Sequence, residues 1–234
     1  STDAVADAIT AFMSTLISRD SPFDQYAAGE YYALTGAQRR GFELFRSERF
    51  NCVACHELPT FRSDEFKILG VRDAVGLTDA GGAASGDPAL AGAFAVPTLR
   101  NVALHPPYMH NGVEPTLGTV IAFYLNGGGD NPAIPRHRLS SELRPFSATT
   151  RELQDLEAFL VALTDESARP QLPATLPSGL MPVAATENPA RATVTATSAL
   201  PPSATPRTHR VPKNGSIQDA VDRARPGDTV IVPP

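Results

Sequence analysis

The run Cys-Val-Ala-Cys-His at residues 52–56 constrains this chain more than any other part of its sequence. A Cys-x-x-Cys-His run is the attachment pattern of a c-type haem. Two thiols at this spacing can add to the two vinyl groups of one porphyrin, and the adjacent histidine then lies under the iron as its proximal ligand. The pattern therefore predicts one covalent haem c, attached at Cys52 and Cys55 and ligated by His56.

Three other uses of a close cysteine pair compete with haem attachment. A thioredoxin-like redox pair is expected beside a strand-helix-strand pattern, which this sequence lacks. A zinc site needs a second pair of ligands, whereas the chain contains 2 cysteines in all. A structural disulfide between Cys52 and Cys55 would be strained at this spacing. Haem attachment is therefore the preferred interpretation.

Composition and charge exclude several classes of function. The net charge is −5 and there is no dense run of Lys and Arg, so we expect neither a nucleic-acid binder nor a binder of anionic membranes. The longest apolar stretches, at residues 120–125 and 156–163, are far shorter than the roughly 20 residues of a membrane helix, so no span is expected. The first residues lack a basic leader and an apolar signal core, so we expect any export signal to be removed or to lie outside this chain.

Apolar residues at three- and four-residue spacing predict a mainly α-helical domain over residues 3–166. The expected helices lie at residues 3–19, 35–47, 117–124 and 149–163. The first is expected to end at Ser21-Pro22, and the last to open with a capping box from Thr149 to Glu152. Residues 76–92 are rich in glycine and have no periodicity, which predicts a long surface loop.

The texture of the sequence changes after the last expected helix. Residues 170–206 are rich in Pro, Ala, Thr and Ser, so we expect an extended linker at residues 167–208. Residues 209–234 then suggest a strand at 209–211, a helix at 217–224 and a strand at 229–232. The segment NGSIQDAVDRARPGDTVIVPP resembles the first turn of right-handed parallel β-helix domains of the pectin-lyase type, which implies the truncated start, or cap, of a β-helix domain.

Four ordered motifs carry a second and longer resemblance. They are GFELF before NCVACH, VPTLRNVALHPPYMHNG, TLGTVIAFYLNGGG and ELQDLEAFLVALT. Together they resemble the C-terminal haem domain of the bacterial dihaem cytochrome c peroxidase and MauG family, over about residues 3–165. The resemblance implies a cytochrome c-like helical fold with one haem. It also implies an extracytoplasmic, periplasmic location, and that this chain is a piece of a longer protein whose peroxidatic half is missing.

The sixth ligand of the iron is the main open question about the site. Leu117, Val120, Ile121 and Tyr124 share one helical face, which turns Tyr124 inward. The resemblance implies the same residue, because the family's distal ligand lies fourteen residues after the histidine of the PYMHNG-like motif and is a tyrosine in MauG-like members. The residues alone leave two alternatives: Tyr124 as a packed core residue, and Met109 as the ligand, since thioether ligation is frequent in small cytochromes.

Other polar residues have weaker predicted roles. His110 is expected to donate or accept hydrogen bonds near the haem rather than to bind iron, while His105 and His137 are expected in solvated loops beside prolines. The resemblance places Arg100 next to the haem, where a half-buried guanidinium would suit a propionate; a surface arginine is the alternative. It also implies a calcium ion held partly by backbone carbonyls of residues 105–107.

Three functional hypotheses follow from these expectations. In the first, the chain transfers electrons through one haem as the relay half of a peroxidase-type oxidoreductase, with an electron-donor or electron-acceptor protein and a second haem domain or subunit as partners. In the second, it is a haem-bearing subunit or docking module of a larger complex without peroxidase activity of its own. In the third, an open iron position makes it a self-sufficient peroxidase. No catalytic residue is assigned within this chain.

Overall fold

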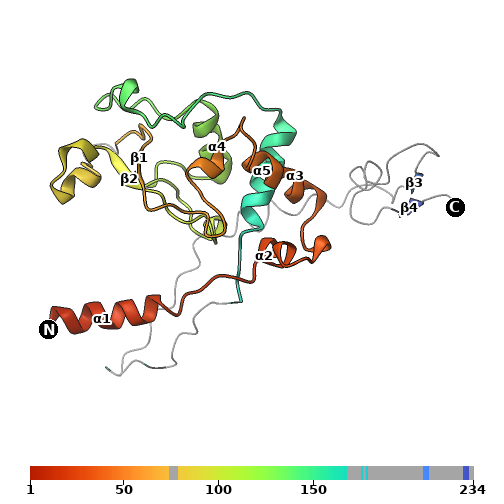
Figure 1. Cartoon of the computed structure of the whole chain (residues 1–234), viewed down its shortest axis with the longest axis horizontal. Helices are drawn as coiled ribbons and strands as arrows, with labels where there is room; N and C mark the ends of the chain where they lie inside the picture. The colour runs from red at the N-terminus through yellow and green to blue at the C-terminus, as the bar shows by residue number, and fades with distance from the viewer. Residues whose placement is uncertain (74–78, 168–174, 176–177, 179–207, 211–228, 232–234) are drawn as a thin grey trace.

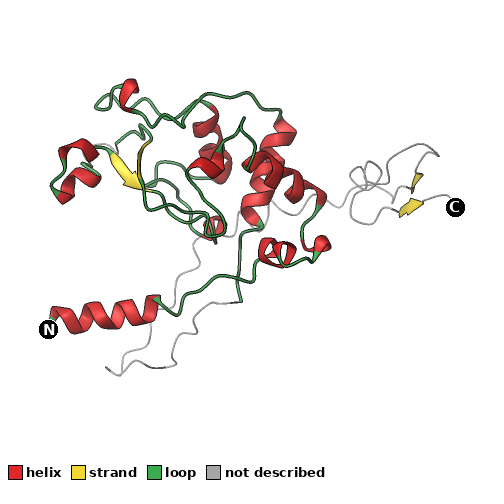
Figure 2. Ribbon diagram, in the orientation of Figure 1, coloured by secondary structure: helices red, strands yellow, loops and turns green. Residues whose placement is uncertain are grey.

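The computed structural model describes residues 1–73, 79–167, 175, 178, 208–210 and 229–231. The α-helices in these ranges are α1 (Thr2–Met13), α2 (Pro22–Ala27), α3 (Gly36–Phe45), α4 (Leu117–Leu125) and α5 (Thr150–Val161), and the strands are β1 (Phe66–Ile68), β2 (Ala93–Ala95), β3 (Thr208–Arg210) and β4 (Thr229–Ile231). Short 3-10 turns occur at Tyr31–Ala33, Cys52–Ala54, Gly82–Ser85, Pro88–Leu90, Val102–Leu104 and Arg136–Arg138. Loops connect most of these elements (Figure 2), and no helix of the described part is long and apolar enough to cross a membrane.

Helices α3 and α5 cross closely and form the centre of the domain (Figure 1). Each begins with a capping box, with Thr35 and Thr149 as N-caps, and the box at Thr149 is the one that the sequence predicted. At the crossing, Gly41 is required because a Cβ atom there would lie 1.9 Å from the carbonyl oxygen of Asp155. The two helices can therefore approach more closely than side chains would allow, and this fixes the path of the chain from α3 into the cysteine run.

Aromatic rings fill the space beneath this crossing. Phe159 of α5 lies at the centre, with ring centroids 5.2 Å from Phe45 and 5.7 Å from Phe23. Phe61 closes the group at 5.1 Å from Phe23. Tilted and edge-to-face contacts at these distances stabilise a core beyond the effect of area burial alone. Around them the buried core comprises Leu34, Phe50, Ala103, Tyr108, Leu117, Ile121, Leu156, Leu160, Ala162 and Leu163.

The beginning of the chain departs from the sequence prediction. The helix expected at residues 3–19 ends at Met13, and Ser21-Pro22 begins a helix instead of ending one. Ser21 caps α2 by a reciprocal box with Asp24, and Pro22 occupies the first turn, where its missing N–H costs nothing. Phe23 of α2 enters the core, whereas α1 buries no residue and extends away from the rest of the domain (Figure 1).

The glycine-rich loop is bracketed by two strands that the sequence did not predict. β1 and β2 pair antiparallel, with Lys67 opposite Phe94. Three residues per strand are too few to display the alternation by which strands are recognised in a sequence. The described part of the predicted loop, residues 79–92, contains two 3-10 turns and no α-helix or strand, so the loop prediction is confirmed there.

The last part of the chain is described only at two strands. β3 and β4 pair in parallel, with Thr208 opposite Thr229. They match the two strands expected near residues 209–211 and 229–232 to within one residue. The helix expected at residues 217–224 and nearly all of the linker expected at residues 167–208 lie outside the described residues.

Candidate haem site

The cysteine run forms a tight turn directly after α3. Asn51 adopts a left-handed backbone conformation, with φ 54°, and its N–H donates to the carbonyl of Ser47 at 2.8 Å. The next three residues make a 3-10 turn, in which the N–H of His56 donates to the carbonyl of Cys52 at 2.9 Å. The turn places two half-buried cysteines and the histidine on one short loop against the core.

Cys52 and Cys55 are both free thiols in the structure. Burial raises the pKa of the Cys52 thiol to about 12, and burial also raises the pKa of Cys55. The thiolate is the nucleophile in disulfide exchange, so a thiol this hard to ionise is poorly suited to redox cycling. The thioredoxin-like interpretation is thereby disfavoured. Among the described residues there is no group of three or more His, Cys, Asp or Glu side chains that could hold a metal ion.

His56 is oriented by a backbone carbonyl. Its Nδ1 lies 3.1 Å from the carbonyl oxygen of Phe61, so Nδ1–H donates and Nε2 retains the lone pair that a metal requires. Burial lowers the pKa of His56, against a smaller opposite effect of the carbonyls of Phe61 and Pro97, and this keeps the ring neutral. Phe61 is fully buried and has a φ of 54°, an unusual value for a non-glycine residue. The chain thus holds the His56 ring in one tautomer.

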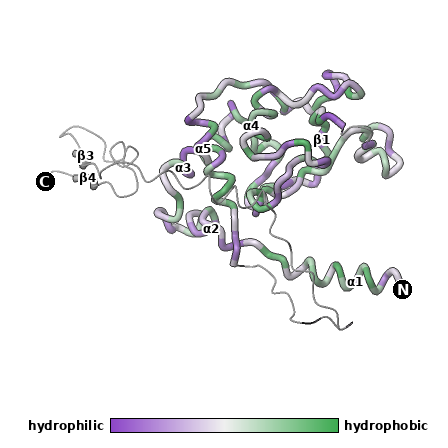
Figure 3. The backbone as a smooth tube through the Cα atoms, turned by 180° about the vertical axis from the view of Figure 1, so that it is seen from behind, coloured by the Kyte–Doolittle hydropathy of each residue, from purple (hydrophilic) through white to green (hydrophobic). Residues whose placement is uncertain are grey.

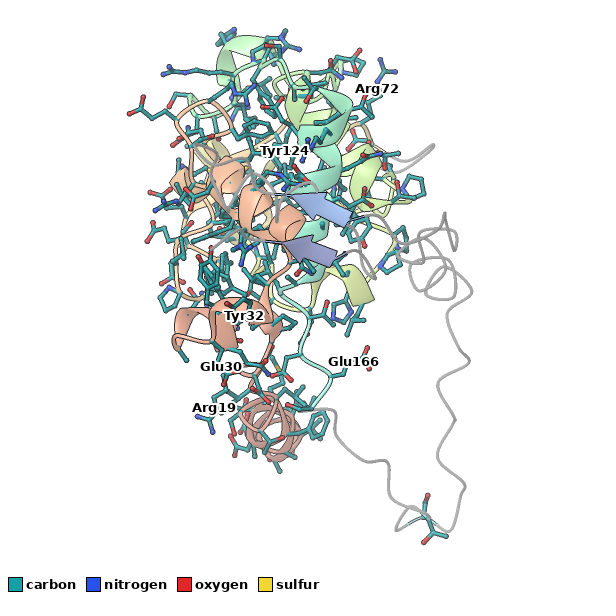
Figure 4. The ribbon with its side chains drawn as sticks, turned by 90° about the vertical axis from the view of Figure 1, so that its right-hand side faces the viewer. Arg19, Glu30, Tyr32, Arg72, Tyr124 and Glu166 are labelled. Atoms are coloured by element: carbon teal, nitrogen blue, oxygen red, sulfur yellow. The ribbon has the colours of Figure 1, made fainter. Side chains whose placement is uncertain are left out.

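Tyr124 reaches the same site from α4. Thr116 caps this helix, and Leu117 and Ile121 are buried on its inner face. Tyr124 follows Ile121 by three residues, and its side chain is half-buried. Burial raises the pKa of the Tyr124 phenol, and negative charge on Cys52 and Cys55 would raise it further. The phenol is therefore close enough to both sulfur atoms for their charge to affect its pKa, and Figure 4 shows Tyr124 among the helices of the domain. Met109, the alternative ligand, is half-buried in a loop and has a left-handed φ of 68°.

Arg100 is half-buried, as a propionate-binding arginine would be, but its partner in the structure is a carboxylate of this chain. Its two terminal nitrogens donate to the two oxygens of Asp24, each at 2.8 Å, and one also donates to the carbonyl of Pro59 at 2.9 Å. The guanidinium carbon lies 5.8 Å from the centre of the Phe61 ring. The surface-arginine alternative is wrong. The pair joins α2 to the segment whose carbonyl orients His56, and propionate binding stays a prediction.

Lys67 is a residue of the site that sequence reasoning missed. Its ammonium lies 2.7 Å from Glu142 and 2.6 Å from Glu65, and these two carboxylates raise the pKa of Lys67. Lys67 is also close enough to Cys55 to act on its ionisation. Only 12% of the Lys67 side chain is exposed. No local signal could have shown this, because Lys67 and Glu142 are 75 residues apart.

The three remaining histidines are exposed, and the hydrogen-bonding role of His110 near the haem stays a prediction. His105 is exposed beside Pro106, and His137 is exposed in the 3-10 turn Arg136–Arg138 that follows Pro135. His110 is also exposed and stacks on Phe94 with ring centroids 3.6 Å apart.

The site residues that the fold brings together are Cys52, Cys55, His56 and Tyr124. Two thiols on one turn, an oriented imidazole and a phenol near the sulfur atoms are a donor set that fits a haem c.

Comparisons with known proteins give the same answer as this donor set. No protein-family model matches the chain. The methylamine utilization protein MauG of Methylorubrum extorquens is 37% identical over 172 residues, which cover 72% of this chain and 47% of that protein. Cytochrome-c peroxidase IdrP2 of Denitromonas iodatirespirans is 34% identical over 182 residues, with coverages of 66% and 47%. The chain is a homologue of MauG and the cytochrome c peroxidases.

Solved structures support this relationship. A MauG-like protein associated with microbial copper homeostasis has a TM-score of 0.56 and 36% identity, and the match covers 64% of this chain and 53% of that one. The diheme peroxidase BthA from Burkholderia thailandensis has a TM-score of 0.52 and 28% identity, with coverages of 70% and 48%. The chain thus spans about half the length of the curated relatives it matches. These matches give no support to a pectin-lyase-like β-helix domain at residues 209–234, which stays a prediction.

Proposed function

We propose that this chain is a c-type cytochrome module that carries electrons through one covalent haem, as the relay half of a peroxidase-type oxidoreductase. The observation that carries the proposal is the Nδ1 contact of His56 with the Phe61 carbonyl, at 3.1 Å, beside two free thiols on the same turn. This arrangement prepares both attachment points and the proximal ligand. The homologues are haem cytochrome peroxidases, which supports an oxidoreductase role.

The residues of the chain would tune the cofactor rather than catalyse a reaction. A bound haem c supplies an iron that cycles between ferric and ferrous states. His56 would hold the iron through its Nε2 lone pair, while the bond from its Nδ1–H to the Phe61 carbonyl fixes the plane of the ring and raises its basicity. The phenylalanine core behind the turn excludes water, which lowers the reorganisation needed when an electron arrives or leaves.

We further propose Tyr124 as the distal ligand, with Met109 as the alternative. Two observations support this assignment. Tyr124 is three residues after Ile121, which is buried on the inner face of α4. Its phenol is also close enough to Cys52 and Cys55 for their charge to affect its pKa. A phenolate is a hard anionic donor that favours ferric iron and would lower the potential relative to a thioether. A ligand in the sixth position would also keep peroxide from the metal, which argues against a self-sufficient peroxidase.

The covalent haem is tested by extraction. Because thioether bonds survive denaturation, the denatured protein should retain its haem absorbance after treatment with acidified acetone. In the Cys52→Ala/Cys55→Ala double variant the colour should pass into the solvent. Loss of all colour from the unsubstituted protein would show that the haem assignment is wrong.

The distal ligand is tested by two matched substitutions. Tyr124→Phe removes the phenol oxygen alone and should convert a six-coordinate ferric spectrum into a high-spin, five-coordinate one that reacts faster with peroxide. Met109→Leu preserves the volume of the side chain and should leave the ferric spectrum nearly unchanged. The reverse pattern would make Met109 the ligand, and a high-spin spectrum before any substitution would support the open-iron hypothesis.

The same proposal includes the partners and the surroundings of the module. We propose an electron-donor or electron-acceptor protein, a second haem domain, and an extracytoplasmic, periplasmic location, since haem of this type is attached outside the bacterial cytoplasm. A calcium ion at the carbonyls of residues 105–107 belongs to the same expectation. A haem-bearing docking module without peroxidase activity is the second candidate function, and the fully exposed α1 favours it. Peroxide turnover with a reduced donor protein distinguishes the two.

A further inference from the structure

Lys67 is an unusual cation for this chain. The lysines of the sequence are Lys67 and Lys213, and arginine supplies the other permanent cations. Lysine carries a compact point charge, whereas arginine spreads its charge over a planar group with five N–H donors. Lys67 lies in β1, and only 12% of its side chain is exposed. A cation withdrawn from water to this degree needs partners that the fold itself provides.

Two carboxylates are the partners of this ammonium. It lies 2.7 Å from Glu142, which is half-buried, and 2.6 Å from Glu65, which is exposed. Backbone contacts hold the segment before Glu142 against β1. The N–H of Ile68 donates to Oγ of Ser140 at 2.9 Å, and the N–H of Ser140 donates to the carbonyl of Ile68 at 3.0 Å. The pair of Lys67 with Glu142 is therefore fixed by the fold, unlike an ion pair between mobile surface side chains.

Strand β1 is joined to the backbone that orients His56. The N–H of Val96 donates to the carbonyl of Glu65 at 3.1 Å, which continues the pairing of β1 with β2 by one residue. The carbonyl of the next residue, Pro97, is a hydrogen-bond partner of His56. Lys67 is thus two residues from a backbone contact with the segment that faces the histidine. Figure 3 shows β1 on the same side of α5 as α4.

The charges of Lys67, Glu142 and Glu65 reach the cysteine run. Burial raises the pKa of the Cys55 thiol; among the nearby charges Lys67 has the largest effect and lowers this pKa, whereas Glu142 and Glu65 raise it. Under the proposed function, Cys55 is one of the two attachment points of the haem. Reduction adds one electron to the iron and lowers its charge from 3+ to 2+. A nearby cation therefore favours ferrous iron, and a nearby carboxylate favours ferric iron.

We propose that Lys67 and Glu142 form a charge pair that sets the reduction potential of the haem, with Lys67 raising the potential and Glu142 lowering it. Neither side chain binds the iron, and both act through space. The inference rests on the proposed function, because it requires a haem attached at Cys55, and it adds two residues outside the cysteine run that tune this haem. Loss of an ion pair disturbs the local structure from whichever side it is broken. Opposite shifts of the potential are therefore an electrostatic signature that a purely structural pair would not give.

The test is the midpoint potential of the haem-loaded protein, measured by spectroelectrochemical titration. Lys67→Met removes the ammonium and keeps an unbranched side chain, so the potential should fall. Glu142→Gln removes the charge of the carboxylate and preserves its shape, so the potential should rise. Each substitution should change the ratio of ferrous to ferric haem at a fixed applied potential by about tenfold, the effect of one unit charge in partly buried surroundings. The double variant Lys67→Met/Glu142→Gln should lie between the two single variants.

A matched control separates this effect from a general change of surface charge. Arg72→Gln breaks the exposed pair of Arg72 with Asp130 and should leave the potential nearly unchanged, because solvent screens that pair. Far-UV circular dichroism and the ferric spectrum show whether each variant keeps its fold and its iron ligands. Shifts of the same sign in Lys67→Met and Glu142→Gln, or no shift in either, would overturn the proposal. A protein without covalent haem would overturn the proposed function, and this inference with it.

Discussion

Gly41 offers the sharpest test of how the fold positions the haem turn. Replacing glycine by alanine inside a helix ordinarily stabilises it by about 1 kcal/mol. At Gly41 we expect the opposite sign, because the new Cβ would lie 1.9 Å from the carbonyl oxygen of Asp155 and 2.7 Å from the Cβ of Phe159. Both neighbours belong to a packed helix and cannot rotate away.

The magnitude follows from relieving this overlap. Helices α3 and α5 would have to separate by about 1 Å, and overpacking of this kind costs about 3 kcal/mol. Subtracting the gain in helix propensity leaves a net loss of about 2 kcal/mol in the free energy of unfolding. For a domain of this size that corresponds to a fall of about 4–8 °C in Tm.

The assay is thermal and urea unfolding of the haem-loaded protein, followed by far-UV circular dichroism. Gly118→Ala is the matched control, because a Cβ there meets no atom closer than 3.8 Å and should be neutral or slightly stabilising. If Gly41→Ala is as stable as the unsubstituted protein, the close crossing of α3 and α5 is not what holds this domain together, and the reasoning is refuted.

Two further predictions concern polar contacts that hold the domain together. Burial alone would raise the pKa of Asp165, but the hydrogen bonds donated by Ser167 and by nearby backbone N–H groups lower it to about 2. Because this is below the pKa of about 3.9 in the unfolded chain, the carboxylate should stabilise the folded protein by about 1–2 kcal/mol above pH 4. That stabilisation should be lost as the pH falls toward 2. Urea midpoints across that range should fall less steeply in Asp165→Asn, and equal slopes would contradict the assignment. Arg100→Lys should cost about 1–2 kcal/mol, because lysine cannot reproduce the half-buried two-point contact with Asp24. The exposed Arg72 makes a similar contact, and Arg72→Lys should change the urea midpoint little; equal effects of both substitutions would show that burial does not matter here.

Local signals in the sequence determined the elements of the site. The Cys-x-x-Cys-His run identified the haem turn. Helices α3, α4 and α5 each begin with a threonine N-cap whose hydroxyl pairs with a polar residue three positions later, namely Gln38, Thr119 and Glu152. The inward direction of Tyr124 is a prediction from helical spacing alone. These features depend on residues within a few positions of one another, so the sequence displays them directly.

The end of α1 shows where local reasoning failed. The apolar spacing continues through Leu16 and Ile17, and on that ground the helix was expected to reach residue 19. In the structure the helix ends at Met13, and the backbone N–H groups of Arg19 and Asp20 donate to the carboxylate of Asp165, which lies 145 residues after Asp20. The apolar periodicity of the segment therefore did not set the end of the helix.

Only the tertiary structure decided how the site is held. The Phe61 carbonyl that orients His56, the Asp24 carboxylate that engages Arg100 and the Glu142 carboxylate beside Lys67 are each invisible in the sequence around their partners. Their pairing depends on the crossing of α3 and α5 and on a left-handed turn at Phe61, which form only when the aromatic core packs. The sequence alone determined which chemical groups are present, and packing at long range decided which atoms face each other, because hydrogen bonds require a geometry that no single segment can set by itself.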